Sequence, residues 1–283
     1  MSSVALVTDS TADIPRGMRE RLGISMVPLK VMFGSESYLD NIELQPAEFY
    51  RKLTGSPVLP TTSQPSPADF FDVFKRLTDE GKSVVSVHLS GAFSGTYQSA
   101  MIAKSMFEDD ADITVIDSKS ASYGYGMIVV AAAELAARGA SKEEIIAEVH
   151  RLRREMRLYF LVDTLEFLQK GGRIGKAAAL VGSLLNIKPI LTIDDEGVIN
   201  SADKVRGQKR AMARIAELLQ ADLGDRPVNL MIALTPGFEE NAKDMAALLK
   251  ERFNVSNYVE TEIGPVIGTH AGPGTVGVFV TPA

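Results

Sequence analysis

Two segments rich in hydroxyl side chains contain the residue types needed to hold an anion. Residues 90–96 read Ser-Gly-Ala-Phe-Ser-Gly-Thr, directly after an apolar run at 84–89 and before a helix-compatible stretch. A strand that ends in such a turn and then begins a helix directs free N–H groups and the positive end of the helix dipole at one point. The second segment, residues 61–66, reads Thr-Thr-Ser-Gln-Pro-Ser and has no charged side chain. Together the two segments predict a site for a small anionic group, held by neutral donors without a lysine.

The candidate donors are hydroxyl groups, one glycine N–H and one imidazole. They are Thr61, Thr62, Ser63, Ser90, Ser94, Gly95 and His270. Helix capping alone explains a serine at a strand-to-helix turn, and a polar loop before a capped helix explains the threonines. The imidazole, in an uncharged loop, is either a buried neutral group or a donor to an anion. The residue types alone leave both interpretations open.

Three patterns that resemble catalytic or nucleotide-binding motifs lack the required context. Residues 272–277 match a dinucleotide fingerprint, but they precede a strand and leave no room for the helix that the motif requires. Gly81-Lys82-Ser83 would need a glycine at position 76, where this chain has arginine. In residues 91–95 the serine is one position late for a nucleophile elbow. We therefore expect no bound nucleotide and no standard serine hydrolase.

The composition excludes several other kinds of site. The 283 residues include 30 Lys plus Arg and 36 Asp plus Glu, a net charge of −6, which is the opposite of what a nucleic-acid binder needs. Without cysteine there are no disulfides or zinc thiolates, and three scattered histidines do not predict a metal site. No membrane-spanning segment is expected, because the uncharged stretches are rich in Ser, Gly and Pro. No signal peptide is expected either. These features predict a cytoplasmic protein with no nucleic-acid partner.

The elements that must position the hydroxyl segments repeat the order strand, polar turn, helix. Short strands are expected at residues 4–7, 84–89 and 113–116, and a capping box of Ser66 and Asp69 should begin a helix. Further helices are expected at residues 127–138 and 141–157, the second of which begins with a capping box of Ser141 and Glu144. This alternation predicts a three-layer α/β domain with a parallel sheet between helices.

The pattern changes near residue 157, after a basic helix end. Strand-like runs follow at 159–162, 189–193, 228–234 and 276–280, and helices at 164–170, 206–219 and 239–253. We predict two α/β domains, residues 1–157 with a parallel sheet and residues 158–283 with a mixed sheet. The segment 27–33 could join either domain.

Two stretches in the second half have ordinary explanations as well as functional ones. Residues 171–176, Gly-Gly-Arg-Ile-Gly-Lys, can be a glycine helix cap with incidental basic residues. The small apolar residues at 177–187 form either a core helix or the wall of an apolar cavity, and the core is the more common outcome. Arg206 stands at a basic helix end, which is usually a solvated face.

Six segments together resemble the DegV family of bacterial fatty-acid-binding proteins. They occur in the family's order over nearly the whole chain, at residues 7–13, 60–66, 90–97, 165–174, 188–190 and 268–274. Each motif is modest, and their joint occurrence is highly specific. One departure is Phe93, in a segment where the family more often has a second serine and a leucine.

The resemblance implies a long-chain fatty acid bound between the two domains, with its carboxylate held by Thr62 and Ser94 and with His270 close by. Family members are the non-catalytic subunit of a two-part fatty acid kinase. They present the carboxylate to a separate ATP-binding subunit, which makes acyl phosphate for phospholipid synthesis. Arg173 and Arg206 would belong to the basic surface near that kinase subunit. The resemblance implies no cofactor or metal, and at most transient contact with a membrane surface.

The energy of apolar burial is consistent with a site that has few charges. Each buried methylene contributes about 0.8 kcal/mol, so about 14 methylenes give roughly 11 kcal/mol before ordering costs. The rival hypothesis is an enzyme that uses Ser94 as nucleophile, or Asp9 and His270 as acid and base, on a small acylated or phosphorylated substrate. A regulator whose ligand only signals is a third. A carrier should retain fatty acid through purification, which distinguishes it from an enzyme.

Overall fold

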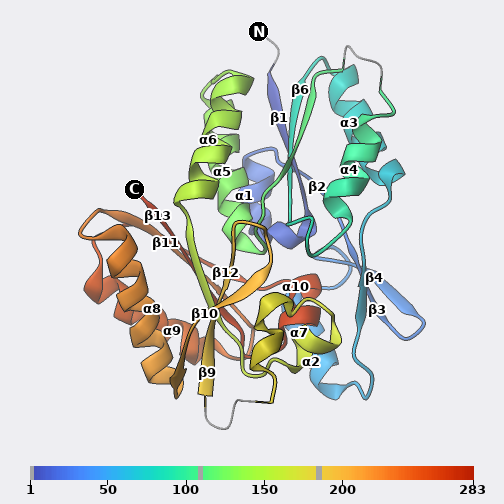
Figure 1. Cartoon of the computed structure of the whole chain (residues 1–283). Helices are drawn as coiled ribbons and strands as arrows, with labels where there is room; N and C mark the ends of the chain where they lie inside the picture. Colours follow the sequence, from blue (N-terminus) through green and yellow to red (C-terminus); the bar gives the residue numbers. More distant parts are fainter. Residues whose placement is uncertain (1–2, 108–110, 183–186) are drawn as a thin grey trace.

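The computed structural model describes residues 3–107, 111–182 and 187–283, and those residues form three sheets (Figure 1). The first sheet is parallel, in the order β2-β1-β6-β7. Its strands are β1 (Val4–Asp9), β2 (Ser25–Val27), β6 (Ser83–His88) and β7 (Ile113–Asp117). Helices cover both faces: α3 (Pro67–Asp79) and α4 (Thr96–Lys104) on one, and α1 (Arg16–Arg21), α5 (Tyr123–Ala137) and α6 (Lys142–Glu155) on the other.

Neighbouring residues on the parallel strands face different helical layers. On β1, Leu6 packs in the cluster with α5 and α6, whereas Val7 packs with α3 and α4. On β6, Val85 packs in the cluster with α5 and α6, and Val84 packs with α3 and α4. Both faces of the sheet are therefore buried, which is why these strands read as continuous apolar runs.

Two of the helices begin with the capping boxes that the sequence predicted. The Ser66 hydroxyl accepts the Asp69 N–H at the start of α3, and the Asp69 carboxylate accepts the Ser66 N–H at 2.7 Å. Ser141 and Glu144 form the same reciprocal pair at the start of α6. These bonds satisfy N–H groups that the helix itself leaves free.

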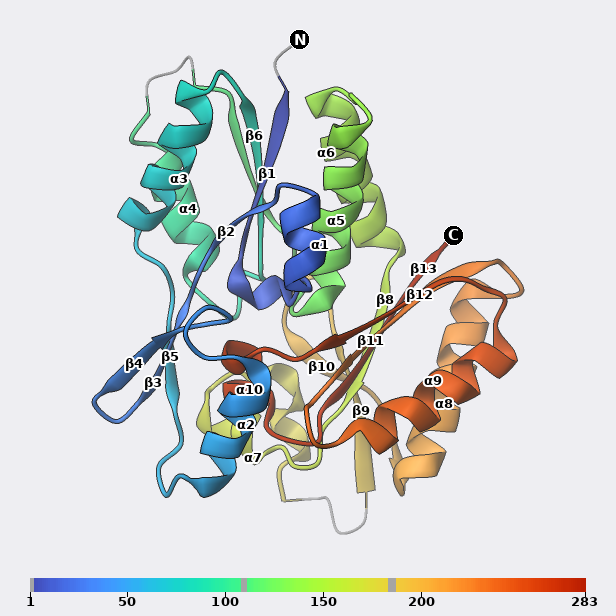
Figure 2. The same ribbon diagram turned by 180° about the vertical axis from the view of Figure 1, so that it is seen from behind.

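The second sheet is mixed and has six strands in the order β10-β9-β8-β13-β11-β12. They are β8 (Arg157–Leu161), β9 (Ile187–Ile193), β10 (Ile199–Arg206), β11 (Val228–Leu234), β12 (Val255–Glu262) and β13 (Val276–Pro282). Helices α8 (Gln208–Leu223) and α9 (Glu239–Arg252) cover the outer face (Figure 2). The inner face belongs to the same buried cluster as α5 and α6, so the two α/β units share one core.

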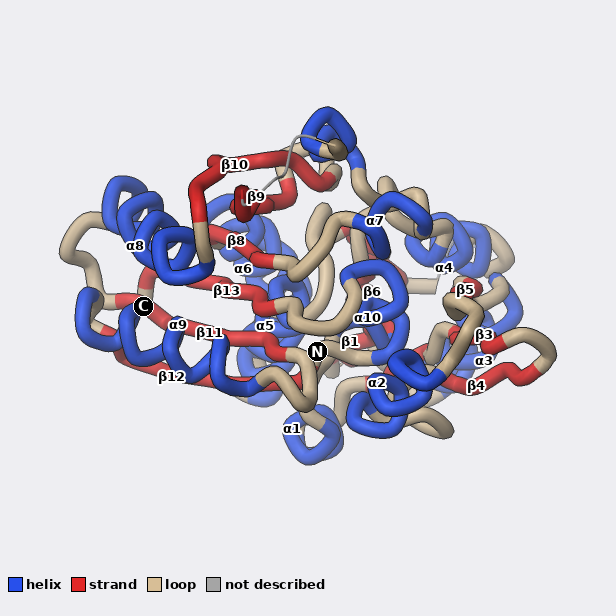
Figure 3. Tube along the Cα trace, turned by 90° about the horizontal axis from the view of Figure 1, so that it is seen from below, coloured by secondary structure: helices blue, strands red, loops and turns tan. Residues whose placement is uncertain are grey.

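A third, antiparallel sheet connects the two units. It has the order β4-β3-β5, from β3 (Lys30–Phe33), β4 (Glu36–Leu39) and β5 (Thr61–Ser63). It packs with α2 (Pro46–Gly55) against α10 (Pro265–Ala271), which places Val266 in the cluster of Phe49 and Leu53. Figure 3 shows α2, α10 and α7 (Glu166–Lys170) in a row beside the six-stranded sheet. The segment 27–60 therefore contacts both halves of the chain.

The predicted α/β class, with one parallel and one mixed sheet, is confirmed. Several boundaries differ from the prediction: α5 begins at Tyr123, and α6 ends at Glu155 because Arg157 already belongs to β8. The helix expected from Arg206 begins at Gln208, since Arg206 is the last residue of β10. The division into domains at residue 157 stays a prediction. Within the described ranges, no helix combines the length and the apolar character needed to cross a bilayer.

Candidate ligand-binding site

A cavity lies between the inner face of the six-stranded sheet and the loops that follow the parallel strands. The atom-free space there measures about 920 Å³, a figure that includes open solvent. The sheet contributes Phe160 and Phe279, and the loops after β6 and β7 contribute Phe93 and Ala121. Most of the lining is apolar. The space therefore suits an elongated apolar ligand more than a sugar or a nucleotide.

A polar group of side chains lines one part of this cavity. Thr62 Oγ1 lies 2.8 Å from His270 Nε2, which joins β5 to the last turn of α10. The positive charge of Arg173 helps to lower the pKa of His270. The Arg173 Nε donates to the Phe93 carbonyl at 3.0 Å, next to Ser94. Three of the predicted ligand-binding residues, Thr62, Ser94 and His270, line the cavity. Arg173, which the resemblance assigned to a partner surface, lines it too. We call these four residues the polar end.

The loop with Ser94 occupies the position where ligands usually bind in open α/β sheets. Strands β1 and β6 are neighbours, and the chain leaves them towards opposite sides of the sheet, to β2 and to β7. Ligands bind at the carboxyl ends of the strands at such a switch point. The Ser94 hydroxyl accepts the Thr96 N–H at 3.3 Å and lies 2.9 Å from Thr96 Oγ1. Ser94 thus holds the N–H of the first residue of α4 while also lining the cavity.

His270 is a neutral imidazole at physiological pH. Burial lowers its pKa to about 4, and the positive charge of Arg173 contributes in the same direction. Its Nδ1 is buried without a hydrogen-bond partner in the described part of the chain. The ring packs on Gly171, where a Cβ atom would collide with Nδ1. Position 171 therefore has to be glycine for the ring to keep its place beside Thr62.

Arg173 connects two loops and lines the cavity. In addition to the bond with the Phe93 carbonyl, its Nη1 donates to the Gly171 carbonyl at 2.7 Å. The guanidinium forms no ion pair with a carboxylate among the residues that the structure describes. The sequence placed this arginine on a basic surface, and the structure places it at the cavity as well. It supplies the positive charge of the polar end.

Ser90 and Gly95 have packing roles outside the cavity lining. Ser90 is fully buried, and its hydroxyl donates to the Gly197 carbonyl at 2.9 Å, in the turn between β9 and β10. A Cβ on Gly95 would lie 2.9 Å from Nε2 of Gln64, a cavity-lining residue. Gly95 therefore allows the loop after β5 to approach the start of α4. The predicted ligand roles of Ser90 and Gly95 stay predictions.

Thr61, Ser63 and Arg206 do not line the cavity either. Thr61 and Ser63 flank Thr62 on β5, and alternation along a strand directs them to the other face. Arg206 is exposed at the end of β10. Their predicted roles in binding the ligand or a partner are not tested by these positions. Of the apolar stretch 177–187, Ala177 is buried in the core, and residues 183–186 lie outside the described residues.

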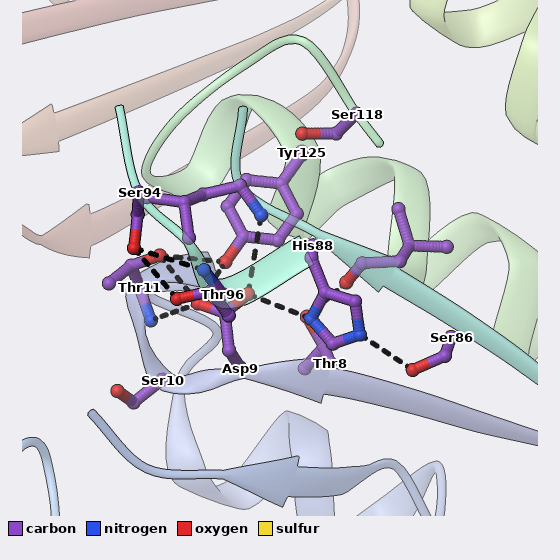
Figure 4. Close-up of polar contacts among 12 residues, drawn as sticks. Thr8, Asp9, Ser10, Thr11, Ser86, His88, Ser94, Thr96, Ser118 and Tyr125 are labelled. Atoms are coloured by element: carbon purple, nitrogen blue, oxygen red, sulfur yellow. Dashed lines mark hydrogen bonds and ion pairs between the residues drawn. The ribbon is translucent and has the colours of Figure 1, made fainter. Parts of the chain in front are cut away.

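A buried network fixes the end of β6, from which the Ser94 loop begins (Figure 4). The Asp9 carboxylate accepts hydrogen bonds from the Tyr125 hydroxyl at 2.8 Å, from His88 Nδ1 at 3.0 Å and from the Leu89 N–H at 3.2 Å. Burial alone would raise the pKa of Asp9, but His88, Thr11 and Tyr125 together hold it below its ordinary value. Asp9 is fully buried and does not line the cavity, so it is poorly placed to act as an acid or base with His270.

Two further buried carboxylates hold the start of α10, which carries His270. Asp40 Oδ1 accepts the Val266 N–H at 3.3 Å, and Asp13 Oδ1 accepts the Gly264 N–H at 3.0 Å. Burial raises the pKa of Asp40 to about 7, and it also raises the pKa of Asp13. No local sequence pattern marks these two acids, because their partners are backbone groups more than 200 residues away.

The family model described as "Uncharacterised protein, DegV family COG1307" matches residues 3–283. The chain belongs to the DegV family. Protein DegV of Bacillus subtilis is 39% identical over 277 residues, which cover 98% of each chain.

Two solved structures show the similarity of this DegV protein to its family. "Fatty Acid Binding of a DegV family Protein from Thermus thermophilus" has 40% identity and a TM-score of 0.93, and the match covers 99% of this chain and 100% of that one. A "fat acid (stearic acid)-binding protein" from Eubacterium ventriosum has 28% identity and a TM-score of 0.86, and the match covers 100% of this chain and 98% of that one.

Proposed function

We propose that this DegV protein binds a long-chain fatty acid in the cavity and acts as a non-catalytic, cytoplasmic carrier. The observation that carries the proposal is an apolar cavity with Thr62, Ser94, Arg173 and His270 at its polar end. Structural relatives described as fatty-acid-binding support the choice of ligand. The acyl chain would lie along the inner face of the six-stranded sheet, and the carboxylate would lie among these four side chains.

The hydrogen bonds of His270 explain how neutral groups could hold an anion. Buried N–H groups rarely lack a partner, whereas acceptors without a partner are less rare. The proton of the neutral ring therefore belongs on Nε2, and Nδ1 is the bare acceptor. The ring then donates to Thr62 Oγ1, which leaves the Thr62 hydroxyl free to donate to a carboxylate. Ser94 would supply a second hydroxyl and Arg173 the compensating charge.

The same geometry supports presentation of the carboxylate to another protein. The Ser94 hydroxyl has hydrogen bonds only to Thr96 among the described residues, so it has no imidazole that could activate it as a nucleophile. We propose that a separate kinase subunit supplies ATP and phosphorylates the bound carboxylate, and that the product serves phospholipid synthesis. The exposed Arg206 would then contribute to docking of that subunit. No cofactor other than the bound lipid is part of this proposal.

Mass spectrometry of the purified protein tests the carrier role. Native spectra and organic extracts should show one long-chain fatty acid per chain, and added palmitate or oleate should bind to stripped protein. Absence of lipid together with no binding of added fatty acid would contradict the proposal.

An assay for ADP and acyl phosphate tests whether the phosphoryl transfer needs a separate kinase subunit. ATP, Mg²⁺ and fatty acid should give acyl phosphate only when a kinase subunit is added. Turnover by the isolated chain that a Ser94→Ala substitution abolishes would favour the enzymatic alternative.

A further inference from the structure

Two small residues lie side by side on the inner face of the six-stranded sheet. Gly277 of β13 pairs with Ala233 of β11, and its partner on the other side is the large Phe160 of β8. Two residues further along β13, Phe279 lies opposite large residues on both neighbouring strands. Residues two apart on a strand point to the same face. Gly277 and Ala233 therefore leave a depression beside Phe160, and Phe279 stands at its edge.

The ring of Phe279 is held between two glycines from different layers. A Cβ on Gly124 of α5 would lie 2.8 Å from ring atoms Cδ1 and Cε1, and a Cβ on Gly277 would lie 3.1 Å from Cε2 and Cζ. The side chain is 3% exposed and lines the cavity. Both edges of the ring are thus in contact with backbone, which fixes its orientation.

Phe279 lies far from the polar end of the cavity. The Thr275 hydroxyl donates to the carbonyls of Ala271 and Gly272, at 3.0 and 2.9 Å, so the start of β13 is next to His270. A strand rises about 3.3 Å per residue, which places Phe279 about 13 Å further along the sheet than Thr275. Of its two partners in the sheet, Met231 is buried and does not line the cavity, whereas Leu158 does. No residue of β13 beyond Phe279 lines the cavity, so the cavity ends at the row that holds this ring.

We propose that Phe279 is the end wall that sets the length of the acyl chain this protein accepts. The inference rests on the proposed fatty-acid function. A chain that stops short of the ring leaves apolar space empty, and a longer one must displace a ring that two glycine backbones hold in place. Up to the wall, each added methylene should improve affinity about fourfold, which corresponds to about 0.8 kcal/mol of apolar burial.

The test is the affinity of stripped protein for saturated fatty acids from 12 to about 20 carbons. Phe279→Leu shortens the wall and should move the best-bound length up by at least two carbons. Gly277→Ala adds a methyl group to the floor of the cavity next to the ring and should move it down. Phe74→Leu, a buried phenylalanine in the cluster with α3 and α4, is the matched control and should leave the optimum unchanged.

Several outcomes would overturn the assignment. Unshifted optima in both Phe279→Leu and Gly277→Ala, or shifts in the same direction, would contradict it. If these variants do not fold, the wild type decides: its affinity should rise with length and then fall abruptly, whereas a continuous rise through 20 carbons rules out the wall. A wild type that binds no fatty acid of any length would overturn the proposed function itself, which is a distinguishable result.

Discussion

Acid is expected to destabilise the folded chain through His270. Its pKa drops from an ordinary value of 6.5 to about 4 on folding, first because of burial and then because of Arg173. Between these two pH values the unfolded chain binds a proton that the folded chain does not, so stability falls as the pH decreases from about 6.5 to about 4. At about 1.4 kcal/mol for each pKa unit, the loss amounts to about 3 kcal/mol.

Proton NMR and urea unfolding together can measure this effect. The chain has only three histidines, so a His270→Gln spectrum assigns the His270 signal by its disappearance. The ligand-free wild type should show this imidazole still neutral at pH 5. In urea unfolding, the stability of the wild type relative to that of His270→Gln should fall as the pH decreases from 7 to 4.5. An imidazole that titrates near 6.5 would refute the reasoning.

The same titration links the residue to its proposed function. A carboxylate bound at the polar end places a negative charge near the ring, which favours the protonated form. Adding palmitate should therefore raise the pKa of His270, and Arg173→Gln should raise it without ligand. If palmitate binds and the His270 signal does not respond, the carboxylate lies elsewhere.

Three further predictions follow from the cavity and the acids that surround it. Thr62→Ala and Ser94→Ala should each weaken fatty-acid binding by about 1.5–3 kcal/mol, and the double variant should deviate from additivity if both hydroxyls hold one carboxylate; calorimetry measures this. Arg173→Ala should reduce both lipid binding and acyl-phosphate formation, whereas Arg206→Ala should reduce only the latter; equal effects would contradict the two placements. Burial raises the pKa of Asp40 from 3.8 to about 7, so stability should fall by about 4 kcal/mol as pH rises from about 4 to about 7, and Asp40→Asn should remove that dependence. If the stability measured by urea unfolding changes equally with pH in Asp40→Asn and in the wild type, this last prediction is wrong.

The sequence predicted the central strands of the two larger sheets and the edge strand β7, and it missed the other edge strands of those sheets. The strands β6 and β13 are apolar runs because helices or a second layer cover them. By contrast, β10 and β12 lie at the two edges of the six-stranded sheet and contain many polar residues, including Asp203 and Glu260. The short strands of the third sheet were missed as well, because three or four residues give too little periodicity to detect.

The candidate site also contains residues that the sequence could predict and contacts that it could not. Thr62, Ser94 and His270 could be selected from the sequence because they stand in uncharged segments rich in Gly, Ser and Thr. The contact of Gln64 with Gly95, and the carboxylates of Asp13 and Asp40 beneath α10, depend on the approach of distant segments. No local pattern encodes such an approach, since each partner looks like an ordinary loop residue on its own.

A crystal structure of the palmitate complex tests the central claim most directly. We predict a carboxylate oxygen within hydrogen-bonding distance of Thr62 Oγ1 and of Ser94 Oγ, with the acyl chain along β8 and β13 and its last carbons near Phe279. A reversed ligand with its carboxylate at Phe279, or a ligand bound outside this cavity, would contradict the account.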